Sequence, residues 1–161
     1  MKRIAGFLCV LVIFTLSACS GIDSNIREYD GNNTLANNEG YVIFGSKSAN
    51  PALKFEFLKH FDSYITQAYI AGEDHHMLIL PEGEYCFSTI YSKTTQFKPY
   101  PASSYHGWDF KVEAGKINYF GELILDGNNM RKYYDFSAIQ ARVQQDYPEI
   151  AEQYGFVEAS L

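Results

Sequence analysis

Seven short apolar runs separated by turn residues occupy the chain between residues 41 and 125, and this rhythm limits the folds open to it. Most runs have the length of ordinary strands, and several alternate, as where Phe55 and Phe57 alternate with Lys54 and Glu56. A period of two places apolar side chains on one face of a strand. The pattern predicts a mainly β fold, an antiparallel β-sandwich of about seven strands. The predicted strands are residues 41–44, 53–58, 64–70, 77–80, 84–91, 108–112 and 117–125.

Two turns and one glycine stand out between and within these strands. Pro81-Glu82-Gly83 separates two strands, since Pro fixes φ and Gly accepts a positive φ. Residues 113–116 predict a hairpin turn with Gly115 in the left-handed position and 117–125 as the returning partner strand. Gly121, inside that strand, predicts a bulge or a close backbone approach.

The C-terminal part has a different period. Apolar residues recur there at helical spacing, at Phe136, Ile139, Val143 and Tyr147. Ser137 and Gln140 have the spacing of a capping box, and Pro148 suits the first turn of a second short helix. We therefore expect a short helical segment at about 136–154, attached to the sandwich.

Two segments resemble a known class of domain. Residues 80–85 (LPEGEY) and 110–123 (FKVEAGKINYFGEL) are similar to the turn and the hairpin of transthyretin-like or carboxypeptidase-regulatory-like sandwiches. The resemblance covers roughly residues 40–126 and implies a sandwich fold. Its motifs are structural, so it implies little about activity.

The N-terminus has the features of a secretory signal. Lys2 and Arg3 precede an apolar stretch, residues 4–16, that is too short to cross a bilayer core needing roughly 20 helical residues. The following Leu16-Ser17-Ala18-Cys19 resembles the lipobox of bacterial lipoproteins, which implies cleavage before Cys19 and a lipid on its thiol. An ordinary signal peptide with an incidental cysteine is the alternative.

These features divide the chain into a signal peptide (1–18), a lipidated N-terminus with a flexible tether (19–39) and a domain (40–161). Residues 20–39 are rich in Asn and poor in apolar side chains, which is typical of a tether. The lipid on Cys19 would attach the protein to a membrane, because two or more acyl chains make attachment stable. We expect an extracytoplasmic protein, and Ser20 in place of Asp favours the outer membrane, facing the periplasm, in a Gram-negative cell.

Net charge argues against one class of partner, and the cysteine content argues against a disulfide. Loss of Lys2 and Arg3 leaves 11 basic against 19 acidic residues, a net charge of −8, which argues against nucleic acid. Cys86 is the one cysteine left for the folded part, so no intramolecular disulfide is available. Its apolar, strand-like context favours burial over reactivity.

No residue set fits a known catalytic or cofactor motif, and we expect no enzyme activity, no cofactor and no metal. His75 and His76 are adjacent, and adjacent side chains in a strand point to opposite faces. A zinc site needs three or four converging ligands, and His60 or His106 could join only through tertiary contact. A metal-dependent hydrolase using His75, His76 and His106 remains as an alternative.

The segment 97–108 is the most suggestive candidate for binding, since it is longer than an ordinary strand connection and carries aromatic residues with Pro. Phe97, Tyr100 and Tyr105 are candidate partner-binding residues for a protein or a glycan; alternatively, they cover the edge of the sheet. The sequence thus favours a lipid-anchored, non-catalytic binding or envelope-accessory module. A structural lipoprotein of a secretion or envelope complex, docking a partner through 97–108, is the other reading.

Overall fold

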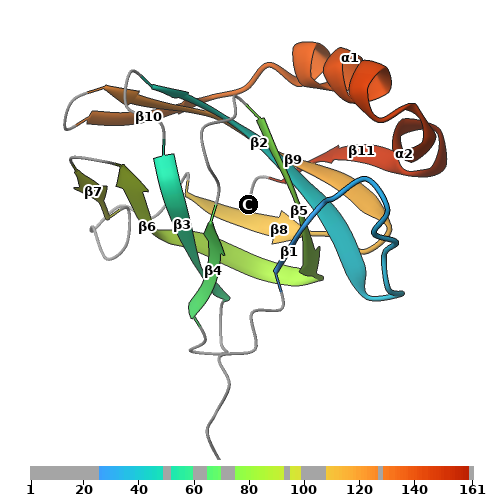
Figure 1. Ribbon diagram of the computed structural model, residues 1–161, viewed down its shortest axis with the longest axis horizontal. Coiled ribbons are helices and arrows are strands. Elements are labelled where there is room, and N and C mark those ends of the chain that lie inside the picture. Colours follow the sequence, from blue (N-terminus) through green and yellow to red (C-terminus); the bar gives the residue numbers. More distant parts are fainter. Residues whose placement is uncertain are drawn as a thin grey trace, which may run out of the picture.

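A computed structural model describes residues 26–48, 52–59, 65–69, 75–92, 95–98, 108–126 and 129–159. The described strands form two sheets, and two helices lie against one of them (Figure 1). Sheet A has the order β1-β5-β2-β9-β10, and β11 also pairs with β9. Its strands are β1 (Arg27–Glu28), β2 (Glu39–Ser48), β5 (His75–Pro81), β9 (Lys116–Asp126), β10 (Asn129–Tyr133) and β11 (Gly155–Glu158).

Sheet B has the order β4-β3-β6-β7, and β8 also pairs with β6. Its strands are β3 (Ala52–Lys59), β4 (Ile65–Tyr69), β6 (Gly83–Ser92), β7 (Gln96–Phe97) and β8 (Asp109–Val112). All seven predicted strands are therefore present, as β2, β3, β4, β5, β6, β8 and β9, and the mainly β, sandwich-like fold is confirmed.

The space between the sheets holds the larger core. Phe44 of β2, Phe57 of β3 and Phe87 of β6 meet there, with the Phe57 and Phe87 ring centroids 4.6 Å apart. Phe87 also packs on Phe120 of β9, at 4.6 Å between centroids. Edge-to-face and tilted contacts of this kind add to the free energy gained by burying the rings.

The outer face of sheet A is buried as well. Helices α1 (Phe136–Asp146) and α2 (Pro148–Gln153) supply Ile139, Val143 and Ile150 to a second core. The sheet supplies Tyr41 and Ile43 from β2 to that core, among others, whereas Val42 and Phe44 face the other sheet. The helix cover thus explains why residues 41–44 are apolar without alternation, since both faces of a covered sheet are dry.

Sheet A is mixed, where the sequence predicted an antiparallel arrangement. β2 and β9 pair in parallel at its centre, and β11 pairs in parallel with the first part of β9. Parallel neighbours need a long crossover connection, and here all the described strands of sheet B lie between β2 and β9 in sequence. Short-range turn signals carry no information about such a pairing.

The predicted hairpin at 113–116 is wrong. β8 pairs with β6 in sheet B, whereas β9 belongs to sheet A, so the turn carries the chain from one sheet to the other. Gly115 does have a left-handed φ of 66°. The buried Asn118 side chain binds the turn, accepting from the Glu113 N–H at 2.9 Å and donating to the Tyr41 carbonyl at 2.9 Å.

The prediction for Gly121 is confirmed. The register between β2 and β9 shifts between Ile43 and Phe44, which pair with Tyr119 and Gly121, so Phe120 is the extra residue of a bulge. Gly121 has φ 124°, and a Cβ there would lie 3.0 Å from the Tyr133 carbonyl oxygen. Both the conformation and the close approach require glycine.

Both predicted helices are present, but the capping residue differs. Asp135 is the N-cap of α1, and its carboxylate accepts from the Ala138 N–H at 3.1 Å. Ser137 lies inside the helix and donates its hydroxyl to Asp135 at 3.3 Å. The capping box predicted for Ser137 and Gln140 was therefore placed two residues too late.

Candidate functional site

Residues 26–39 form an N-terminal arm that belongs to the folded domain, which corrects the predicted tether over this stretch. β1 pairs antiparallel with β5 through Arg27↔Ile79 and Glu28↔Leu78. The preceding Ile26 is buried in the core between the sheets. The lipobox and Cys19 lie outside the described residues.

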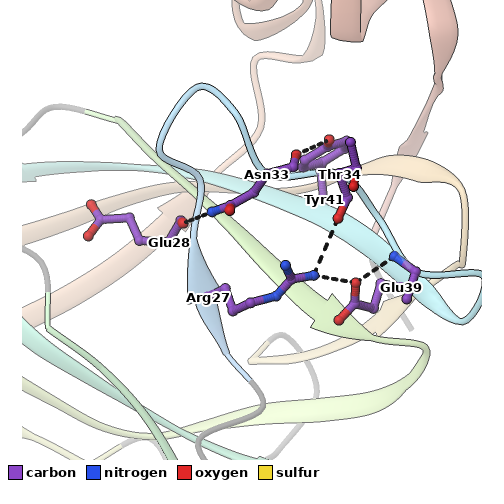
Figure 2. Close-up of polar contacts among 7 residues, drawn as sticks. Arg27, Glu28, Asn33, Thr34, Glu39 and Tyr41 are labelled. Atoms are coloured by element: carbon purple, nitrogen blue, oxygen red, sulfur yellow. Dashed lines mark hydrogen bonds and ion pairs between the residues drawn. The ribbon is translucent and has the colours of Figure 1, made fainter.

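Polar contacts fasten the arm to itself and to β2 (Figure 2). The Arg27 guanidinium pairs with the carboxylate of Glu39, which also accepts from the Ala36 N–H at 2.7 Å. The Tyr41 hydroxyl donates to the Asn33 carbonyl at 3.3 Å. These contacts join residues that are close in sequence, so the arm is a compact loop held by its own side chains.

The arm also packs on the helices. The Tyr29 ring lies edge-on to Tyr41 of β2, at 5.6 Å between centroids, and to Tyr147 between α1 and α2, at 5.4 Å. Tyr154 contacts Tyr41 in the same manner at 5.2 Å. Burial raises the pKa of Tyr41 to about 12, with further increases from the nearby Tyr154 and Tyr29 hydroxyls. The arm is thus part of the second core.

The two ends of segment 97–108 are held by the core. Phe97 is buried between the sheets, and β7 pairs with β6 through Ile90↔Phe97. Trp108 is half-buried and packs against the same core, with its ring 6.4 Å from that of Phe120. Phe97 is therefore a core residue that a partner cannot reach. Tyr100 and Tyr105, the other candidates, lie outside the described residues.

His75 and His76 point to opposite faces of β5. His76 is buried beside Phe44, at 5.3 Å between rings, on the side of the inter-sheet core. His75 lies on the outer face and approaches Glu122. The two imidazoles are not brought together, and His60 and His106 lie outside the described residues. Within the described ranges, no group of three or more His, Cys, Asp or Glu is placed to hold a metal ion.

A polar cluster lies on the outer face of sheet A and consists of the buried Glu122 and Tyr119 with the partly buried His75. Glu122 Oε1 is 3.3 Å from His75 Nε2 and accepts from the Tyr119 hydroxyl at 3.2 Å. The strand between His75 and Glu122 presents Gly45, which pairs in register with both. A Cβ at Gly45 would overlap the Glu122 carboxylate, so the two side chains meet across β2 because glycine leaves the space.

The cluster leaves polar atoms unsatisfied. Glu122 Oε2 and His75 Nδ1 are buried without a hydrogen-bond partner. Burying such atoms costs free energy, unless the contact between Glu122 and His75 offsets it. Burial, the largest influence, raises the pKa of Tyr119. A carboxylate held by a phenol and an imidazole has groups that can move a proton. Glu122 and Tyr119 were not among the residues predicted from the sequence, although an acid inside the apolar run 117–125 is a usable signal.

The Lys132 side chain of β10 is partly buried against aromatic rings. The Lys132 ammonium lies 4.0 Å from the ring centre of Phe120 and 4.9 Å from that of Tyr134. Burial lowers the pKa of Lys132 to about 8, against the opposing effect of nearby Glu158 and Asp109. Lys132 therefore loses its proton at a lower pH than an exposed lysine does.

Cys86 is buried, as the sequence predicted. Burial, followed by the nearby Asp109 carboxylate, raises the pKa of the Cys86 thiol to about 11. The thiolate is the reactive form of cysteine, so this side chain behaves as a small apolar residue.

The comparisons with known proteins give no identification. No family model, no curated protein and no solved structure matches the chain. As for membrane spans, neither α1 nor α2 of the described part has the length and apolarity to cross a bilayer.

Proposed function

We propose that this chain is a lipid-anchored, extracytoplasmic binding or envelope-accessory module of a bacterial cell. The observation that carries the proposal is the run Leu16-Ser17-Ala18-Cys19 after a short apolar stretch with Lys2 and Arg3 before it. The features are independent of one another, and together they are typical of a lipoprotein signal.

A binding role has more support than catalysis. His75 and His76 diverge, and the Cys86 thiol is buried with a raised pKa. A sandwich whose long connection 97–108 starts at buried Phe97 and ends at half-buried Trp108 offers a rigid frame for a binding segment. Binding residues concentrate on such connections. The partner would be a protein or a glycan, bound through Tyr100 and Tyr105.

Replacement of Cys19 by Ala tests the anchor. The variant should lose incorporation of labelled fatty acid and should leave the membrane fraction. The domain should keep its thermal midpoint, because Cys19 is seven residues before Ile26, the first core residue of the described part. Ser20→Ala is the matched control and should keep both lipid and membrane. If Cys19→Ala stays in carbonate-washed membranes, a lipid on that residue is not the anchor.

Paired substitutions test the binding segment. Tyr100→Ala with Tyr105→Ala should weaken whatever partner is captured by crosslinking in the native envelope, with a stability change within about 0.5 kcal/mol. Trp108→Ala should instead destabilise the domain by roughly 2–4 kcal/mol, since a half-buried ring loses much of its packing. A large stability loss at the tyrosines with unchanged partners would show that they only cover the sheet.

A further inference from the structure

The arm fixes the position of Ile26, the first of the described residues. Ile26 is buried between the sheets, and the pairing of Arg27 with Ile79 sets it level with the last residues of β5. The ion pair of Arg27 with Glu39 and the packing of Tyr29 hold the arm behind it. Ile26, seven residues after Cys19 in the sequence, is therefore held at this end of β5.

The same end of the molecule carries two turns. Glu39 pairs with Pro81 at the end of β5, so the turn that leads into Gly83 lies there. The Gly115 N–H donates to the Glu39 carbonyl at 2.8 Å, which places the turn of residues 113–116 at this end too. We call it the arm end.

The opposite end is formed by the far ends of the long strands. β9 runs from Ile117, paired with Tyr41, to Asp126, paired with Asn129 of β10. Phe97 of β7 pairs with Ile90 near the end of β6, so the segment 97–108 starts toward this end (Figure 1). We call it the far end.

Two lengths limit how an anchored domain can be oriented on the membrane. From Ile117 to Asp126 the sheet extends about 30 Å, at roughly 3.3 Å per residue. From Cys19 to Ile26 the chain spans at most about 25 Å, even when fully extended. The connection to the lipid is thus shorter than the sheet.

We propose that the anchored protein stands with its arm end against the membrane and its far end turned away from it. This rests on lipidation of Cys19. In the inverted orientation, with the far end against the membrane, Ile26 would lie at least the length of the sheet above the membrane surface. The connection from Cys19 to Ile26 cannot span that distance, so the far end would have to enter the lipid. The surface that meets the headgroups is then the end with the turns of residues 81–83 and 113–116. A partner from the surrounding compartment meets the far end.

Site-specific fluorescence in vesicles tests the orientation. Glu82→Cys at the arm end and Asn129→Cys at the far end are both exposed positions, and the buried Cys86 gives the background. Each purified lipoprotein, labelled and inserted into phosphatidylcholine vesicles with an acceptor on the headgroups, is compared for energy transfer. We expect efficiency at Glu82 to exceed that at Asn129 at least twofold. Equal or reversed efficiencies would overturn the proposal.

A lengthened connection is the control. Twenty Gly and Ser residues inserted between Asn25 and Ile26 give a coil whose average span alone is about 25 Å, and the difference between the two positions should largely disappear. Mass spectrometry of the purified protein separates the two failures. A chain without lipid overturns both the anchor and the orientation, whereas a lipidated chain with no difference between Glu82 and Asn129 overturns the orientation alone.

Discussion

At Gly45 of β2, the absence of a side chain leaves room for residues of the two neighbouring strands, β5 and β9, to meet. This glycine lies between His75 of β5 and Glu122 of β9, in register with both. The Glu122 carboxylate occupies the volume that a Cβ would fill, and there it meets an imidazole and a phenol. Glycine is present for space, since its backbone is not in the left-handed region.

Gly45→Ala should therefore displace Glu122 and lower the free energy of unfolding by about 2–4 kcal/mol, as expected for overpacking that also breaks a buried pair. Urea denaturation measures the change. Gly115→Ala is the control: it has a positive φ but open space around it, so it should cost only about 1–2 kcal/mol.

A double-mutant cycle separates the causes. With Glu122→Ala in place, Gly45→Ala should cost less, with a coupling of about 0.5–3 kcal/mol. Additive effects would mean that the carboxylate is not what the new methyl group meets.

Cys86 gives a second residue-scale prediction. With a thiol pKa of about 11, roughly one molecule in a thousand carries the thiolate at pH 8, and burial blocks access as well. In protein lacking Cys9 and Cys19, Ellman's reagent should react at least a hundredfold faster after unfolding in urea than in the native state. A rapid native reaction would place the thiol at the surface.

At the scale of elements, the sequence predicts those that carry their own pattern. The seven long or apolar strands and both helices could be predicted because burial imposes a period of two or of 3.6 on their residues. β1, β7, β10 and β11 could not: β1 and β7 have two residues each, and β10 reads NMRKY, without an apolar face. Tertiary pairing alone makes them strands.

The same distinction holds for the candidate site. The burial of Cys86 and the divergence of His75 and His76 follow from local pattern. The meeting of His75 with Glu122 depends on β2 lying between their strands, and the docking of the arm depends on β5 having a free edge. Neither the contact between His75 and Glu122 nor the docking of the arm can be predicted from residues that are neighbours in the sequence.

The helix cap of α1 is testable at this scale. Asp135→Ala should destabilise the protein by about 1 kcal/mol, because the Ala138 N–H loses its acceptor and the helix its N-terminal anion. Ser137→Ala should change stability by less than about 0.5 kcal/mol, since it removes only a 3.3 Å contact to the cap. Thermal unfolding by circular dichroism compares the two; the reverse order would restore the capping box at Ser137.

At the scale of the whole molecule, stability should depend on pH through Lys132. Its pKa is about 8 in the folded protein and close to 10.5 in an unfolded chain, so between these values the unfolded state binds more protons. Stability then rises with pH in that window, because the cost of burying the ammonium is relieved.

Between pH 7 and pH 9 this lysine should add about 1 kcal/mol to the free energy of unfolding. Urea titrations of the natural protein and of Lys132→Met at both pH values measure it as a difference, and Lys111→Met, at an exposed position, serves as the control. A gain that persists in Lys132→Met would assign the effect to another group.

The parallel pair at the centre of sheet A also sets the order of assembly. Synthesis delivers a chain N-terminus first, so β2 emerges long before β9, its central neighbour. Contacts between segments so distant in sequence form slowly. Until Asp126 has emerged, β2, the central strand of sheet A, has one unpaired edge. The nascent protein is therefore most prone to aggregate before β9 has fully emerged, and a holding chaperone would find its target in β2.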